Sequence, residues 1–256
     1  MRTSARLRLG AATVAMLLLV AATGASGARA AASGELKVGA TLLDQPKGQP
    51  WAVNLVLGAN LFDGADPTSQ VSEITKDITF QFPKATVNGS AFKTCAAKDT
   101  DFIREGTRAC PAASVIGTGT AVVDAVGLPF NAKLTIYNGT GTNAARKILL
   151  YAQVTDPGVE VNLPLSGTLR RTSGPYGFKL DLPVPDIQVL SGEFAAIKSF
   201  NVTVGRRTRV GGRKVSYIDA PTSCPSGGWP FSMAVTFKDG TTASDRRAIS
   251  CTLMAT

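Results

Sequence analysis

The 256-residue sequence contains no histidine. Histidine is the general base of Ser-His-Asp and Cys-His nucleophilic systems and a common ligand of zinc, so these classes of active site and metal site are excluded. The four cysteines stand at positions 95, 110, 224 and 251, and none of them forms a C-x2-C pair typical of a zinc site. We therefore expect a protein without a metal site or other cofactor.

The sequence also lacks a convincing helical periodicity, and short alternating segments separated by turn residues take its place. In "YGFKLDLPV", for example, Phe178, Leu180 and Leu182 share one face. Short strands at regular spacing predict an all-β fold, an antiparallel β-sandwich with a partly open β-barrel as the alternative. The predicted strands cover residues 36–43, 51–62, 78–82, 114–123, 130–137, 147–154, 166–171, 176–182, 200–208, 214–218, 231–237 and 247–252.

The N-terminal 30 residues have the pattern of a secretory signal peptide. A segment with three arginines precedes an uncharged, mostly apolar run, and Ala28-Arg29-Ala30 fits the small-x-small cleavage rule. The run is short for a membrane span, which needs about 20 residues, although a retained anchor is the alternative. Cleavage after Ala30 lowers Lys+Arg from 27 to 23 and leaves Asp+Glu at 18, a net charge of +5. We expect a secreted, extracellular protein with no membrane span and one domain over residues 31–256.

Export also bears on the cysteines, because an even number of cysteines in an oxidising compartment is normally paired. Four cysteines allow three pairings, and proximity along the chain favours Cys95–Cys110 together with Cys224–Cys251. On the chain-entropy account, loops of this size contribute about 3–4 kcal/mol each to stability. We therefore predict a fold stapled by two structural disulfides.

Candidate catalytic residues are few. Ser90 and Lys93 match the S-x-x-K spacing of penicillin-recognising enzymes, but the companion Lys-Thr-Gly element is missing from the sequence. Two carboxylates brought together from distant strands would suit a glycan hydrolase. The available acids are Asp156, Glu160, Asp181, Asp186 and Glu193, and no spacing distinguishes any pair of them.

One segment, "NVTVGRRTRVGGRKVSYI", concentrates positive charge. Gly211-Gly212 suits a two-residue hairpin turn, which would place Arg209 opposite Lys214 and put Arg207 on the same face. Directly opposed like charges destabilise a hairpin slightly unless water, counterions or an anionic partner offset them. The segment is either an edge hairpin protected from aggregation or a contact for an anionic cell-envelope component. Nucleic acid is not expected, because no aromatic residues interleave the basic ones.

Four segments, "FPKATVNGSAFKTC", "CPAASVIGTGTA", "AKLTIYNG" and "SCPSGGWPFSMAVTFKDG", occur in this order and are followed by a last cysteine. In this order they resemble a group of uncharacterised secreted actinobacterial proteins with the pattern FPxxxxN…C…CPxxSxxGT. The similarity spans residues 82–251. It implies export and a β fold, and it supplies no catalytic residues.

From these observations we expect an exported, non-enzymatic β-sandwich with a binding or structural role at the cell envelope or outside the cell. One alternative is a carrier that holds an apolar ligand between its sheets. The test is whether the inward positions are large and fill the core or small and leave a cavity, and small residues at strand positions such as Gly117, Gly119 and Ala121 do not decide between the two. A carboxylate-dependent glycan hydrolase is the other alternative. The sequence does not indicate an oligomeric state.

Overall fold

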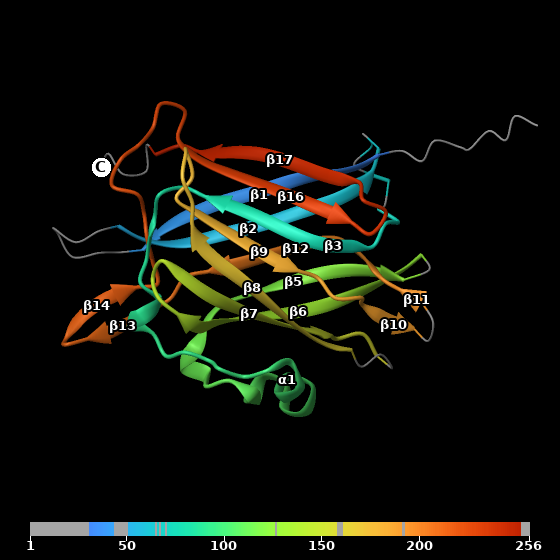
Figure 1. The fold of residues 1–256 in the computed structure, drawn as a ribbon, viewed down its shortest axis with the longest axis horizontal. Helices are drawn as coiled ribbons and strands as arrows, with labels where there is room; N and C mark the ends of the chain where they lie inside the picture. The colour runs from blue at the N-terminus through green and yellow to red at the C-terminus, as the bar shows by residue number, and fades with distance from the viewer. Residues whose placement is uncertain are drawn as a thin grey trace, which may run out of the picture.

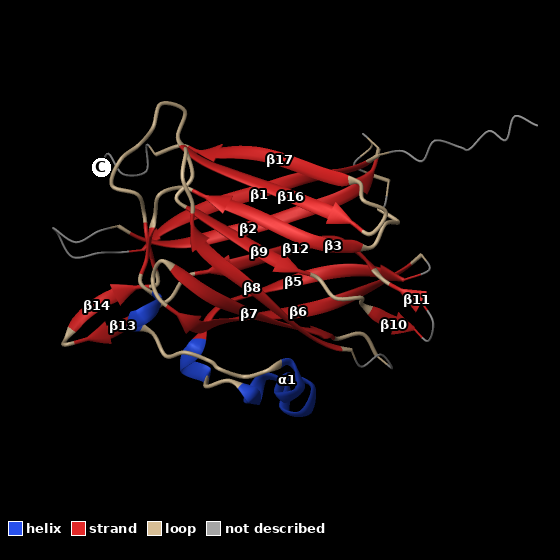
Figure 2. Ribbon diagram, in the orientation of Figure 1, coloured by secondary structure: helices blue, strands red, loops and turns tan. Residues whose placement is uncertain are grey.

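The computed structural model describes residues 31–251, apart from 44–50, 65, 67, 70, 126, 158–160 and 191–192. The predicted signal peptide, with Ala28 and Ala30 at its cleavage site, lies outside the described residues. The fold is dominated by antiparallel strands, and helices are few and short (Figure 2). This confirms the prediction of an antiparallel all-β fold.

The long strands match the predicted ones closely, and the structure adds several short ones. They are β1 (Ala32–Leu43), β2 (Ala52–Asp63), β3 (Thr75–Phe82), β4 (Thr86–Val87), β5 (Val115–Ala125), β6 (Leu128–Gly141), β7 (Ala145–Val154), β8 (Asn162–Arg171), β9 (Phe178–Pro183), β10 (Gln188–Leu190), β11 (Glu193–Phe194), β12 (Ala196–Val204), β13 (Arg207–Val210), β14 (Arg213–Ser216), β15 (Ile218–Asp219), β16 (Trp229–Phe237) and β17 (Thr242–Ile249).

Thirteen of these strands form one sheet in the order β17-β16-β3-β9-β8-β7-β6-β5-β12-β2-β15-β4, with β1 also paired to β2. The sheet folds over on itself, so that β3 and β9 lie in front of β2 and β12 (Figure 1). The first strand, β1, lies next to the last strand, β17. The backbone N–H of Leu36 on β1 donates to the side-chain oxygen Asp245 Oδ2 on β17 at 2.9 Å. No backbone ladder joins β1 to β17 in the described part of the chain, so the sheet is not a closed barrel.

The sheet is tightly packed where β12 pairs with β5, and two glycines allow this. Gly117 and Gly119 on β5 face the backbone of β12, and a Cβ at Gly119 would overlap the carbonyl oxygen of Asn201. A side chain on either residue would force the two strands apart. Gly117 and Gly119 therefore serve the close packing of β5 on β12.

One short helix, α1 (Asp99–Glu105), covers the outer face of β6 and β7 (Figure 1). Phe102 of α1 stacks on Tyr151 of β7 with ring centroids 5.5 Å apart, and both side chains are buried. At its N-terminus, the Asp101 carboxylate accepts a hydrogen bond from the Lys98 N–H at 2.9 Å. Seven residues are too few to show a helical period, which is why the sequence pattern did not reveal this helix.

Both predicted disulfides are present. Cys95–Cys110 encloses the segment that contains α1, and its Cα atoms are 5.2 Å apart. Cys224–Cys251 ties the loop before β16 to the residues after β17. The first disulfide lies in a small buried cluster on the outside of the sheet, separate from the main core between the layers. The disulfides therefore hold loops against the sheet.

Candidate functional site

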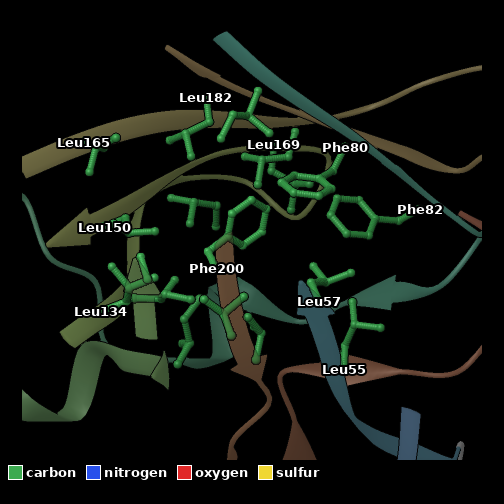
Figure 3. Close-up of a pocket in the computed structure, with 18 of the residues that line it drawn as sticks. Leu55, Leu57, Phe80, Phe82, Leu134, Leu150, Leu165, Leu169, Leu182 and Phe200 are labelled. Atoms are coloured by element: carbon green, nitrogen blue, oxygen red, sulfur yellow. The ribbon is translucent and has the colours of Figure 1, made fainter. Parts of the chain in front are cut away.

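The interior between the two layers contains an apolar cavity of about 200 Å³. Its walls come from both layers, and leucine and phenylalanine side chains point into it from opposite sides (Figure 3). The residues labelled in the figure are Leu55, Leu57, Phe80, Phe82, Leu134, Leu150, Leu165, Leu169, Leu182 and Phe200. Every residue in its lining is apolar except Tyr217 and Trp229, and the Trp229 indole N–H donates to Ser223 O at 3.1 Å.

Small side chains on the β5–β6–β7 wall leave this space open. Ala121 on β5 pairs directly with Ala132 on β6, and Ala152 on β7 pairs with Leu134. All three alanines line the cavity. Three methyl groups on adjacent strands leave a hollow where leucines would fill a core at normal density.

Several larger side chains that line the cavity are not fully buried. Leu150, Leu180 and Phe200 are all of this kind, although they point away from the outer surface of the sheet. In a close-packed core, neighbouring side chains would remove this exposure. The interior is therefore incompletely filled by the protein's own atoms.

A buried polar cluster closes one end of the interior. The Tyr217 hydroxyl, whose ring lines the cavity, donates to Asn138 Oδ1 at 3.1 Å. Arg146 Nη1 donates to the same oxygen at 3.0 Å. Asn138 Nδ2 donates in turn to the carbonyl oxygens of Gly89 at 3.0 Å and Lys93 at 3.1 Å. These bonds fasten the 89–93 segment across the end of β6.

Arg146 is 2 % exposed and donates to two backbone oxygens and two side-chain oxygens, one of them the Asn138 Oδ1 named above. Its guanidinium donates to Gly139 O at 2.8 Å, Gly141 O at 2.9 Å and Ser90 Oγ at 3.2 Å. Within the described residues no carboxylate forms an ion pair with it. Burial lowers the pKa of Arg146 from its usual value, and the nearby Tyr217 partly opposes this.

Tyr217 and Asp219, which are close together in the chain, show that water is largely excluded from this end of the interior. Burial raises the pKa of Tyr217 strongly, and the charge of Arg146 reduces the shift only in part. Burial also raises the pKa of Asp219, against a hydrogen bond from Asn88 Nδ2 to its carboxylate at 2.7 Å. The cluster is a desolvated polar cap that borders an apolar cavity.

The structure does not join Ser90 and Lys93, the pair with S-x-x-K spacing. Ser90 Oγ accepts a hydrogen bond from Arg146, and the Lys93 side chain is exposed. No hydrogen bond connects the two side chains in the part of the protein that the structure describes. Ser90 therefore belongs to the polar cap around Arg146.

The candidate acids occupy separate structural roles. Asp181 forms ion pairs with Arg170 at 2.6 Å and Lys179 at 2.8 Å, and Asp186 forms one with Lys238 at 2.6 Å. Asp156 accepts hydrogen bonds from Asn131, Glu193 is exposed on β11, and Glu160 lies outside the described residues. Burial is the largest single influence on the pKa of Asp181 and acts to raise it. The hydrogen bonds and charges of Lys179, Thr79 and Arg170 together outweigh burial, so the pKa is lowered.

The basic segment forms the predicted hairpin. Strands β13 and β14 pair with Arg209 opposite Lys214 and Val210 opposite Arg213, as the Gly-Gly turn predicts. Arg209 and Lys214 are exposed, whereas Arg207 is partly buried near the base of the hairpin. Whether these residues contact an anionic partner stays a prediction.

The described residues contain no metal-ligand cluster and no membrane-spanning helix. No three acidic or cysteine side chains gather as metal ligands in that part of the chain, and no helix there is long and apolar enough to span a membrane. No known protein family, curated protein or solved structure matches the chain. The apolar cavity, its polar cap and the basic hairpin are therefore the features of the structure that bear on function.

Proposed function

We propose that this protein binds a small apolar molecule, or the apolar end of a larger one, in the cavity between its layers. The apolar lining carries this proposal. The three alanines that leave the hollow open, Ala121, Ala132 and Ala152, come from three adjacent strands of one wall. The proposal adopts the carrier alternative of the sequence analysis in place of a purely structural role.

The volume limits the ligand. An engineered apolar cavity of about 150 Å³ stays dry and binds benzene, so a cavity of about 200 Å³ is large enough for a small ring or a short hydrocarbon chain. Pockets for drug-sized ligands span about 300–1,000 Å³, so a bulky polycyclic molecule would require the interior to expand. The volume therefore favours a small ring or a short hydrocarbon chain.

The chemistry of the lining favours binding over catalysis. Catalysis requires proton donors, nucleophiles or charged groups within reach of the reacting atoms. The two lining residues with polar groups already use them: the Tyr217 hydroxyl donates to Asn138, and the Trp229 indole N–H donates to Ser223 O. Binding would gain about 25 cal/mol for each Å² of apolar surface removed from water, with no directional anchor. Such a site selects by size and shape.

The two disulfides suggest where the protein would bind such a molecule. Two disulfides are typical of proteins that work in oxidising compartments outside the cytoplasm. Apolar molecules have low solubility in water, so a protein that encloses them can carry them between membranes or through the envelope. We propose this role for the mature, secreted protein.

Titration calorimetry with a small apolar probe, such as toluene, tests the proposal. The wild-type protein should bind it with saturation. The double variant Ala121→Leu/Ala152→Leu fills the hollow and should weaken binding at least tenfold.

The control is Ala144→Leu, the same change at an exposed position between β6 and β7. It should bind as the wild type does. Equal binding by the filled variant, or no saturable binding by the wild type, would overturn the proposal.

A further inference from the structure

We propose that the β13–β14 hairpin docks onto the surface of a bilayer that contains anionic phospholipids. This inference goes beyond the proposed ligand binding and does not require an occupied cavity. The hairpin forms its own two-stranded sheet and projects away from the folded sheet at one end of the molecule (Figure 1). A projecting hairpin can reach a flat surface without rearrangement of the core.

The hairpin carries positive charge without compensation. The segment 205–218 contains no acidic residue. Arg209, Arg213 and Lys214 are exposed, and within the described ranges none of the three forms an ion pair. Because Arg209 and Lys214 lie directly opposite each other, their repulsion is relieved when an anion binds between them.

An apolar side chain stands at the tip of the hairpin. Val210 is 49 % exposed and pairs with Arg213 beside the turn, on the face opposite to Arg209 and Lys214. Gly211 and Gly212 form that turn with φ values of 56° and 81°, so the tip is narrow and has no side chain beyond this pair. A small aliphatic tip with cations on both faces behind it suits entry between lipid headgroups while the cations bind phosphates.

Trp51 lies at the same end of the molecule as the hairpin. It is 37 % exposed, and its carbonyl oxygen accepts a hydrogen bond from Ala220 N at 2.7 Å. The next residue, Ala52, pairs with Asp219, a few residues after β14. Tryptophan is enriched where one end of a side chain meets hydrocarbon and the other meets water, so its position extends the same surface.

The apolar tip favours a bilayer over a soluble anionic polymer. A polyanion would bind the arginines and lysine alone and gain nothing from an exposed valine or tryptophan. A bilayer uses both kinds of group. The hairpin also leads directly to the cavity, since β14 ends at Ser216 and the following Tyr217 and Ile218 line it. A docked membrane would therefore lie at the capped end of the interior.

Flotation of the mature protein with vesicles tests the inference. We expect binding to vesicles that contain phosphatidylglycerol and none to vesicles of phosphatidylcholine alone. The triple variant Arg209→Ser/Arg213→Ser/Lys214→Ser should bind about a hundredfold more weakly, since each basic residue near an anionic surface is worth about fivefold. Val210→Ser should weaken vesicle binding several-fold and leave binding to soluble polyphosphate unchanged.

The matched control is Lys93→Ser/Lys98→Ser/Arg108→Ser, which removes the same charge from exposed positions in and around the α1 segment. It should bind vesicles as the wild type does, and thermal melting should confirm that all variants fold. Wild-type binding by the triple variant, or an equal loss in the control, would overturn the inference. So would a Val210→Ser variant that binds vesicles as the wild type does, which would point to a soluble polyanion.

Discussion

The ring of Phe200 on β12 meets the ring of Phe80 on β3 edge to face, with centroids 5.8 Å apart and planes at 89° (Figure 3). The two strands are not neighbours in the sheet, so this contact joins its two layers across the cavity. Aromatic pairs of this geometry contribute about 0.5–1.5 kcal/mol beyond the burial of their surface. The pair both supports the layers and limits the space available to a ligand.

Replacement of Phe200 with alanine should therefore lower the stability of the fold and enlarge the space available to a ligand. We expect Phe200→Ala to lower the free energy of unfolding by about 3 kcal/mol, the lower end for phenylalanine truncation, because the ring already borders empty space. The same variant should bind bulkier apolar probes than the wild type does. Urea denaturation measures the change in stability, and titration with apolar probes of increasing size measures the space available. If the variant binds only the probes that the wild type binds, the position of Phe200 in the cavity is contradicted.

The close approach of β5 and β12 should make Gly119 intolerant of any side chain. We expect Gly119→Ala to cost about 2 kcal/mol or more, because its Cβ would overlap the carbonyl oxygen of Asn201. Gly39→Ala is the matched control on β1, where the new Cβ would lie 3.6 Å from the Val56 side chain. Thermal unfolding should show little change for the control, and equal effects at both positions would argue against the packing described here.

Arg146 should be important for stability, although no carboxylate of the described residues pairs with it. We expect Arg146→Leu to lower the free energy of unfolding by about 3 kcal/mol, because it leaves the carbonyl oxygens of Gly139 and Gly141 without this buried donor and Asn138 Oδ1 with the Tyr217 hydroxyl alone. Arg104→Leu removes a guanidinium that is 68 % exposed and should change stability by no more than about 0.5 kcal/mol. Chemical denaturation of both variants measures the difference.

The buried tyrosines should make the protein sensitive to alkali. Burial raises the pKa of Tyr217 and of Tyr137 in the folded state. In the unfolded chain both hydroxyls lose their protons near pH 10, whereas in the folded protein they stay protonated to higher pH. Their contribution to stability is complete below about pH 10 and decreases as the pH rises above it. Denaturant titrations at increasing pH should show a shallower alkaline decline for Tyr217→Phe than for the wild type.

The sequence predicted the strands and the basic hairpin because both depend on local patterns. Alternation in "YGFKLDLPV" and the Gly211-Gly212 turn specify β9 and the β13–β14 register from neighbouring residues alone. The boundaries were less accurate. β17 begins at Thr242, five residues before the predicted start, because its exposed face carries few apolar residues. The strand predicted over 200–208 is divided at Gly205 and Arg206 into β12 and β13.

The cavity and its polar cap depend on contacts between distant parts of the chain. Ala121 and Ala152 read as ordinary small strand residues, and only the pairing of β5, β6 and β7 places them on one wall. Asn138 and Arg146 lie just outside the strands predicted over 130–137 and 147–154, where polar residues are usually exposed. Their burial follows from the 89–93 segment crossing the end of the sheet. A polar residue buried by tertiary packing leaves no periodic signal.

Native mass spectrometry of the mature protein, purified from an actinobacterial host without detergent, tests the central claim most directly. The account predicts a native mass above that of the chain, and release of a small apolar molecule on denaturation. The filled variant Ala121→Leu/Ala152→Leu, prepared in parallel, should carry none of it. A bare chain mass for the wild type, or the same bound molecule on both proteins, would contradict binding in the cavity.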